Sequence, residues 1–202
     1  MRIFSSFLLV FLSLAAIAKE KEVFRLWNVT GASTLEIEGT TNMNSFLCTS
    51  DYNKGNDRIM ESLNPHSNRW EIYGTLLIDV NDFDCNNRIM NKDFREVLQY
   101  EQYPEIMIDF LNLRETNSQG KNRQAAGLVE ITLAGRSKQY NIISELIFVD
   151  EYYSILKGSY TFRFSDFGLE PPQKAMGLVK VNNEITVHFN LSLEKSLLTI
   201  GN

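Results

Sequence analysis

Apolar and polar residues alternate along most of this chain, and this period-two pattern constrains its fold more than any other feature. In residues 70–80, for example, Ile72, Leu76 and Ile78 share one side with Gly74 and Val80. Successive side chains of a strand point to opposite faces, so such alternation predicts strands. The predicted strand segments are residues 23–38, 45–48, 70–80, 105–113, 125–133, 139–148, 155–164 and 178–193.

The connections between these segments favour an antiparallel sheet. Residues 134–137, Ala-Gly-Arg-Ser, are a hairpin signal between two of the strands. Residues 51–68 are polar and are predicted to be an irregular insert. Many strands joined by hairpins, with few helices, predict a mainly β protein folded as an antiparallel barrel or sandwich.

One segment has helical rather than strand periodicity. Met90, Phe94, Val97 and Leu98 recur at helical spacing, and Pro104 ends the pattern. Asparagines at 86, 87 and 91 offer capping groups near the start. We therefore predict one main α-helix at about residues 88–100. Its apolar face must be buried on the sheet or in the mouth of a barrel.

The N-terminal residues have the pattern of an export signal. Arg2 is followed by an apolar run at residues 7–14 and by Ala16-Ile17-Ala18, a small-residue cleavage pattern. The run is short of the ~20 residues that span a bilayer. We predict a signal peptide at residues 1–18, no integral membrane segment, and one exported domain at 19–202, periplasmic or secreted.

The charge distribution argues against nucleic acid as a partner. Removing residues 1–18 takes away Arg2, which leaves 19 Lys and Arg against 25 Asp and Glu, a formal charge of −6. Acids and bases are interspersed, so the sequence has no basic footprint for nucleic acid.

Cys48 and Cys85 are the only cysteines. In an exported chain, an even pair most often forms a structural disulfide. A redox-active pair and part of a metal site stay open as alternatives. The pair lacks the Cys-x-x-Cys spacing of redox motifs, and His66 and His188 have no ligand-like spacing with either cysteine. We predict a disulfide and no metal site.

The inner rows of the predicted strands mix large apolar residues with glycine and alanine. About eight strands can close into a barrel that is just filled by side chains or that holds one small or elongated ligand. Mixed residue sizes favour a wider lumen. Periodicity alone leaves both the filled barrel and the container open.

A series of short segments spans nearly the whole mature chain. The segments are Gly39-Thr40-Thr41-Asn42, Ser45-Phe46 with Cys48, Asp84-Cys85-Asn86-Asn87, Met90-Asn91-Lys92-Asp93-Phe94 with Leu98, Tyr103-Pro104-Glu105-Ile106, residues 127–135, residues 158–162, Asp166-Phe167-Gly168-Leu169 with Pro171-Pro172, and Gly177-Leu178-Val179-Lys180-Val181. In their order and spacing, these segments resemble the YceI-like family of exported, polyisoprenoid-binding proteins. The resemblance implies a lipocalin-like barrel that binds an extended isoprenoid or similar long-chain lipid along its axis, with no catalysis and no cofactor.

No short motif marks the ligand contacts, so the candidate residues are chosen as large apolar side chains on inner rows and on the predicted helix. They are Phe46, Leu76, Ile78, Met90, Phe94, Ile108, Phe110, Ile131, Ile142, Phe162 and Phe189. For each of these residues, a place in the core is the competing interpretation.

Two other classes of protein stay open. For an enzyme, Ser33, His66, His188 and Asp84 offer reactive groups, but no nucleophile-elbow spacing joins them. We predict no catalytic residue. A structural or adhesion domain with a filled core and a protein partner would also fit. An apolar outer row could support a homodimer; it comprises Tyr73, Leu77, Met107 and Leu111.

Overall fold

Antiparallel strands make up most of the computed structural model, which describes residues 23–52, 57–117, 120, 122–174 and 176–196. The predicted signal peptide at residues 1–18 lies outside the described residues. The strands are β1 (Phe24–Val29), β2 (Thr34–Thr41), β3 (Ser45–Asp51), β4 (Arg58–Asn64), β5 (Arg69–Asp79), β6 (Phe83–Asp84), β7 (Glu105–Asn117), β8 (Asn122–Leu133), β9 (Arg136–Phe148), β10 (Tyr153–Arg163), β11 (Gln173–Lys174) and β12 (Val179–Lys195). One α-helix, α1 (Arg88–Val97), and two 3₁₀ turns, η1 (Val80–Asp82) and η2 (Phe164–Phe167), complete the described elements.

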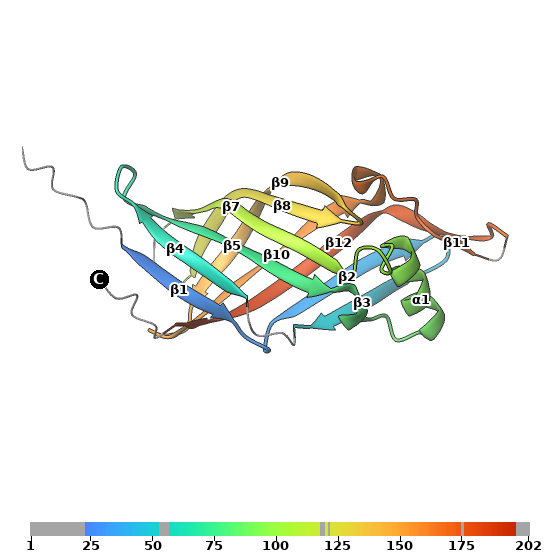
Figure 1. Cartoon of the computed structure of the whole chain (residues 1–202), viewed down its shortest axis with the longest axis horizontal. Helices are drawn as coiled ribbons and strands as arrows, with labels where there is room; N and C mark the ends of the chain where they lie inside the picture. The colour runs from blue at the N-terminus through green and yellow to red at the C-terminus, as the bar shows by residue number, and fades with distance from the viewer. Residues whose placement is uncertain (1–22, 53–56, 118–119, 121, 175, 197–202) are drawn as a thin grey trace, which may run out of the picture.

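Eight of these strands close into a ring. Their order is β1-β4-β5-β7-β8-β9-β10-β12, and β12 pairs back onto β1 through Val29 and Leu193. The strands cross the long axis of the molecule obliquely (Figure 1), as closure into a barrel requires. The predicted antiparallel, lipocalin-like barrel of about eight strands is confirmed.

The long strand β12 gives the two ends of the barrel different walls. Its last residues pair with β1, whereas its middle and first residues pair with β2, from Asn190 opposite Thr34 to Val181 opposite Thr41. Strands β3 and β6 extend the sheet beyond β2. At one end the ring is thus completed by β1 and β4, and at the other end β2, β3 and β6 take that place (Figure 1).

Two sequence-based expectations about this region are wrong. Residues 23–38 form two strands rather than one, because the chain turns at residues 30–33 to pair with two different parts of β12. The expected irregular insert at residues 51–68 contains β4, which forms a hairpin with β5. In β4, Glu61 points inward and Met60 points outward. At these two residues the usual arrangement of apolar side chains inside and polar side chains outside is reversed, which hides the strand in the sequence.

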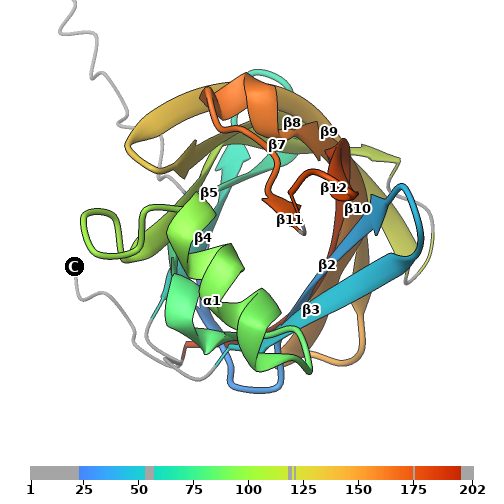
Figure 2. The same ribbon diagram turned by 90° about the vertical axis from the view of Figure 1, so that its right-hand side faces the viewer.

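The predicted helix forms beside the β2–β3 end of the barrel. Asn87 caps it by accepting hydrogen bonds from the backbone N–H groups of Ile89 and Met90. It ends at Val97, before the expected residue 100, because Gln99 adopts a left-handed φ of 55° and the chain turns. Figure 2, a view into this end, shows α1 lying across one side of the mouth and β11 across the other.

A disulfide between Cys48 on β3 and Cys85 ties the entrance of α1 to the barrel wall. The N–H of Cys85 also donates to Asn91 Oδ1 at 2.7 Å, and Asn91 Nδ2 donates to Asp84 Oδ1 at 2.9 Å. The predicted disulfide is present. The first turn of α1 is therefore held by one covalent bond and two hydrogen bonds rather than by deep burial.

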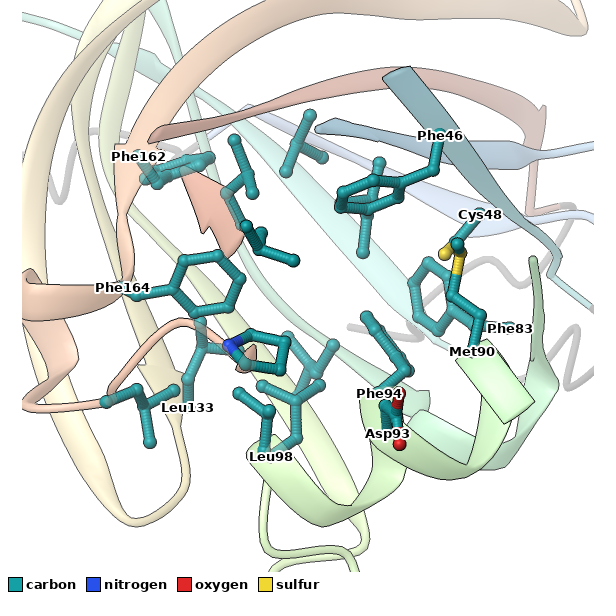
Figure 3. Close-up of a pocket in the computed structure, with 18 of the residues that line it drawn as sticks. Phe46, Cys48, Phe83, Met90, Asp93, Phe94, Leu98, Leu133, Phe162 and Phe164 are labelled. Atoms are coloured by element: carbon teal, nitrogen blue, oxygen red, sulfur yellow. The ribbon is translucent and has the colours of Figure 1, made fainter. Parts of the chain in front are cut away.

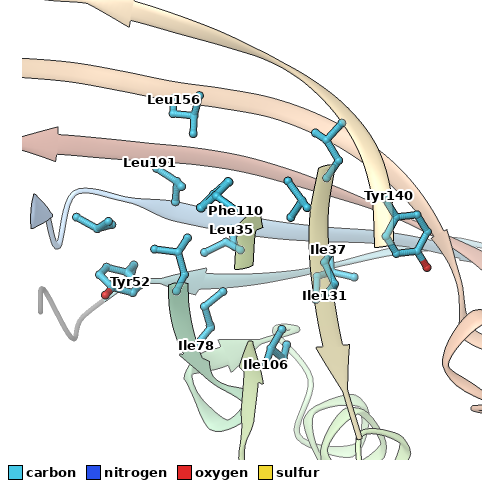
Figure 4. Packing of buried hydrophobic residues seen from close by; sticks show 14 of the residues in the cluster. Leu35, Ile37, Tyr52, Ile78, Ile106, Phe110, Ile131, Tyr140, Leu156 and Leu191 are labelled. Carbon is cyan, nitrogen blue, oxygen red and sulfur yellow. The ribbon is translucent and has the colours of Figure 1, made fainter. Parts of the chain in front are cut away.

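The barrel interior is densely packed at the β1–β4 end. Leu156 of β10, which is opposite Leu146 of β9, is fully buried in this part of the interior (Figure 4). Near β1 and β4 only about 10 Å³ of empty space remains, lined by Trp27, Ile59, Glu61, Ile72, Leu146, Phe148 and Leu193. This end is a conventional solid core.

One carboxylate lies inside that core. Glu61 is 1% exposed. Its Oε2 accepts from Trp27 Nε1 and from Arg25 Nη1, both at 3.2 Å. Among the described residues, Oε1 has no hydrogen-bond partner. Burial raises the pKa of Glu61, and the Arg25 guanidinium offsets only part of this effect.

This raised pKa predicts how the Glu61→Gln variant compares with the wild type. Ionisation of Glu61 opposes folding, so its contribution to stability is present below its unfolded pKa and is lost as the pH rises through its folded pKa. The glutamine side chain does not ionise, so the variant does not lose stability in this way as the pH rises. We expect the variant to gain relative stability between pH 4 and pH 7, by on the order of 1 kcal/mol, measured by urea unfolding.

The control for this experiment is Glu184→Gln, which removes an exposed carboxylate that pairs with Arg163. Because this ion pair is exposed to water, its removal should change the stability little. Other acids with shifted pKa values are common to all three proteins and cancel. Parallel pH profiles for Glu61→Gln and the wild type would contradict the predicted cost of ionising Glu61.

Candidate ligand-binding site

A cavity of about 350 Å³ opens at the α1 end of the barrel. Its walls come from both sides of the barrel, from η2 and from the inner face of α1 (Figure 3). Most of the lining side chains are apolar. The large ones are Leu35, Ile37, Phe46, Ile78, Phe83, Ile89, Met90, Phe94, Val97, Leu98, Ile106, Ile108, Ile131, Leu133, Phe162, Phe164, Phe167, Leu169, Val179, Val181, Ile185 and Val187.

A second cavity of about 50 Å³ lies deeper in the barrel and shares part of its wall with the first. The shared side chains are Leu35, Ile108, Ile131, Phe162 and Val187. The lumen is therefore graded along its axis: open at the α1 mouth, narrow in the middle and solid at the β1–β4 end. A barrel filled throughout, the alternative left open by the sequence, does not describe this interior.

The structure brings all eleven predicted ligand-binding residues to the walls of these two cavities. Seven line the larger cavity, namely Phe46, Ile78, Met90, Phe94, Ile108, Ile131 and Phe162. The other four line the smaller one, namely Leu76, Phe110, Ile142 and Phe189. Their contact with a ligand stays a prediction.

Two glycines explain how large rings fit on these walls. The ring of Phe46 lies over Gly39 of β2, where an added Cβ would be 2.2 Å from it. The ring of Phe189 lies over Gly158 of β10, with a corresponding distance of 2.7 Å. Each glycine thus makes room for an aromatic side chain of the neighbouring strand, as expected for inner rows that mix large and small residues.

Several lining residues were not among the sequence-based candidates. Alternation marks Leu35, Ile37 and Val187 as inward-facing, but it does not show which level of the barrel they occupy. No local pattern marks Phe167 and Leu169, which lie after β10 in a stretch without periodic alternation. They reach the cavity because η2 ends at Gly168, whose φ of 62° turns the chain back over the mouth.

The η2 turn is held on β9 by polar contacts. Asp166 forms an ion pair with Lys138, and Tyr140 Oη donates to Asp166 Oδ2 at 3.1 Å. The hydrogen bond from Lys138 lowers the pKa of Asp166, and burial is the main cause of the raised pKa of Tyr140. At neutral pH, Asp166 therefore stays ionised and Tyr140 stays protonated, so both contacts persist.

Next to this contact, side chains rather than backbone hydrogen bonds complete the barrel wall. The backbone pairing of β9 with β10 extends from Phe148 opposite Ser154 to Ser144 opposite Gly158. Beyond that point the rings of Tyr140 and Phe162 pack edge to face, 4.8 Å between centroids, with Tyr160 beside them. An aromatic cluster thus fills the seam at the level of the larger cavity.

The mouth itself is bridged by one ion pair. Lys174 Nζ on β11 lies 2.6 Å from Asp93 Oδ1 on α1, and both residues line the cavity. The hydrogen bond that Lys174 donates to Asp93 raises the pKa of Lys174. Arg163, a third charged lining residue, pairs with Glu184 at 2.9 Å. The charges at the mouth are therefore paired with one another and the walls behind them are apolar.

Three of the four residues considered from the sequence as reactive groups have side chains engaged in other contacts, and the fourth, His66, does not line the cavity. Ser33 Oγ accepts from the N–H of Ser192, Asp84 holds the start of α1, and His188 lies beside Glu38. Within the described part of the chain, no three or more His, Cys, Asp or Glu side chains are placed to hold a metal ion. The cavity is built for apolar contact.

An antiparallel barrel with an apolar cavity at one mouth is the architecture of a ligand-binding barrel protein. The sequence profile of the YceI-like domain matches residues 28–193. The chain therefore belongs to the YceI-like family. Among curated proteins, none matches this sequence.

Two solved structures have the same fold. BcnA of Burkholderia cenocepacia superposes with a TM-score of 0.61 at 14% identity, covering 82% of this chain and 99% of BcnA. A polyisoprenoid-binding domain from Saccharophagus degradans, implicated in plant cell wall breakdown, gives a TM-score of 0.62 at 11% identity, covering 86% of this chain and 100% of that domain. Within its described residues, this chain has no helix long and apolar enough to cross a membrane.

Proposed function

We propose that this protein holds an elongated apolar ligand, a polyisoprenoid or similar long-chain lipid, inside its barrel and performs no catalysis on it. The observation that carries this proposal is the apolar cavity of about 350 Å³ at the α1 mouth. This volume lies within the range of small-molecule sites, roughly 300–1,000 Å³. The polyisoprenoid-binding domain of the same fold supports the choice of ligand class.

The graded lumen also supports one direction for the bound ligand. Each methylene that leaves water for the apolar lumen gains roughly 0.8 kcal/mol. The hydrocarbon tail therefore points toward the solid β1–β4 end. The polar end of the ligand stays at the α1 mouth, near Asp93 and Lys174, where the charged lining residues are.

Export is the second part of the proposal. In it, residues 1–18 are removed as a signal peptide and residues 19–202 act as one domain in the periplasm or outside the cell. The Cys48–Cys85 disulfide supports this location, because such bonds persist in oxidising compartments. A homodimer through the half-exposed outer row of Tyr73, Leu77, Met107 and Leu111 stays a prediction.

Native mass spectrometry of the gently purified protein tests the proposal. We expect a bound species of several hundred daltons, in keeping with an apolar chain that fills the lumen. We also expect the emptied protein to take up a fluorescent polyprenyl probe. A mass equal to the bare chain together with no probe uptake would reject the carrier function and favour a structural or adhesion domain.

A further inference from the structure

Large apolar side chains are exposed around the mouth of the cavity. Met43 is 75% exposed, Ile89 68%, Met176 104% and Leu178 72%. We call these four residues the mouth patch. They come from three separate segments: the β2–β3 turn, the first turn of α1 and the β11–β12 turn. Figure 1 shows all three segments at the same end of the molecule.

The mouth patch is continuous with the cavity rim. Ile89 itself lines the cavity, and so do Asn44, which follows Met43, and Val179, which follows Leu178. Elsewhere in the described chain, only one large apolar side chain, Ile143 on the outer wall, is exposed to a similar degree, at 67%. Strong apolar exposure is thus concentrated where the apolar lumen opens.

Hydrogen bonds hold the patch in place. Asn42 Nδ2 donates to the carbonyl of Leu178, and the N–H of Lys180 donates to Asn42 Oδ1, both at 2.9 Å. These bonds join the β2–β3 and β11–β12 turns into one lip. The Lys174–Asp93 ion pair joins β11, which precedes the β11–β12 turn, to α1. The exposed side chains are therefore presented by an ordered edge.

Two segments that carry patch residues, α1 and residues 170–181, are locally basic. Residues 88–97 and 170–181 together contain five bases and three acids, although the chain carries a net charge of −5. On α1, Asp93 and Glu96 are paired with Lys174 and Lys92. Arg88 and Lys180, the cations beside the patch, have no ion-pair partner among the described residues.

We propose that the mouth end docks on the surface of an anionic lipid bilayer. The four patch side chains enter the region between headgroups and acyl chains, and Arg88 and Lys180 lie against anionic headgroups. The cavity then opens directly onto the lipid phase, and an apolar ligand enters or leaves without crossing water. This inference rests on the proposed function, since it names the source from which the barrel loads.

Vesicle flotation tests the proposal with the intact protein. The vesicles contain phosphatidylglycerol and phosphatidylethanolamine in one set and phosphatidylcholine alone in the other. We expect the wild type to float with the anionic set and at least tenfold less with the neutral set. Met176→Ser/Leu178→Ser and Arg88→Gln/Lys180→Gln should each reduce flotation at least tenfold. These substitutions leave the backbone groups of Leu178 and Lys180 free to bond with the Asn42 side chain as before.

The matched control is Ile143→Ser, which removes an equally exposed apolar side chain from the outer wall and should float as the wild type does. Equal loss in this control, or no flotation of the wild type, would overturn the proposal. A wild type that elutes as a dimer, becomes monomeric in Met176→Ser/Leu178→Ser and ignores vesicles would instead assign the patch to a second copy of the chain.

A separate measurement keeps this proposal distinct from the carrier function. Uptake of the polyprenyl probe from detergent micelles does not need the bilayer, so the patch variants should take up as much probe as the wild type. Normal probe uptake without vesicle binding would reject only the docking surface. Vesicle binding by a protein that takes up no probe would reject the carrier function and the loading role of the docked state.

Discussion

Replacing Val187 with tryptophan is expected to reduce uptake of a polyprenyl probe at least tenfold while leaving the barrel folded. Val187 lies on the inner row of β12 and lines both cavities, at the level where they meet. An indole at this position would occupy space that the ligand chain needs. Overpacking of a filled core costs typically 1–3 kcal/mol, but here the added atoms enter an existing void.

The measurement is a fluorescence titration of the emptied variant, with near-ultraviolet circular dichroism to confirm folding. The matched control is Asn190→Trp, which places the same side chain on the same strand, but on its exposed outer face. It should bind the probe as the wild type does. Unchanged binding by Val187→Trp would show that the ligand occupies another part of the molecule.

Removing the disulfide is expected to cost about 4 kcal/mol of unfolding free energy, from the loop-closure entropy of a 37-residue separation. In the folded protein, we expect the local consequence of losing the disulfide to be at the mouth. No residue of Arg88–Val97 is fully buried, so α1 depends on its covalent tie at Cys85 more than on packing. We therefore also expect faster release of bound probe from the Cys48→Ala/Cys85→Ala variant.

Urea unfolding and probe-release kinetics measure these two effects. Reductant should lower the stability of the wild type toward that of Cys48→Ala/Cys85→Ala and should leave the variant unchanged. Denatured, unreduced wild type should show no free thiol. Two labelled thiols, or a variant as stable as the wild type, would contradict both the structural role of the disulfide and its support for export.

Sequence reasoning predicted the fold well wherever one face of a strand is uniformly apolar. In residues 125–133, Ala125, Val129 and Ile131 share the buried face, and this segment forms β8, which makes a hairpin with β9. It failed at β4, because an inward Glu61 and an outward Met60 reverse the expected pattern. It also merged β1 with β2, since both alternate and only their different positions on β12 separate them.

The candidate site was predicted in part for a similar reason. Alternation identifies which side chains face inward, and the helical spacing of Met90 and Phe94 identifies the covering face of α1. The sequence pattern does not show whether an inward side chain lies in the solid end of the barrel, as Leu193 does, or at the open mouth, as Ile185 does. Residues of η2 and the following loop have no periodicity and were missed.

Local pattern alone determined that this chain folds as antiparallel strands with one amphipathic helix, because side-chain direction in a strand or helix depends only on nearby residues. Tertiary structure alone decided where the barrel is hollow. That depends on β12 pairing with β1 at one end and with β2 at the other, and on a disulfide that holds α1 beside the mouth. A cavity arises from the distances between strands that are far apart in sequence, and no local pattern contains those distances.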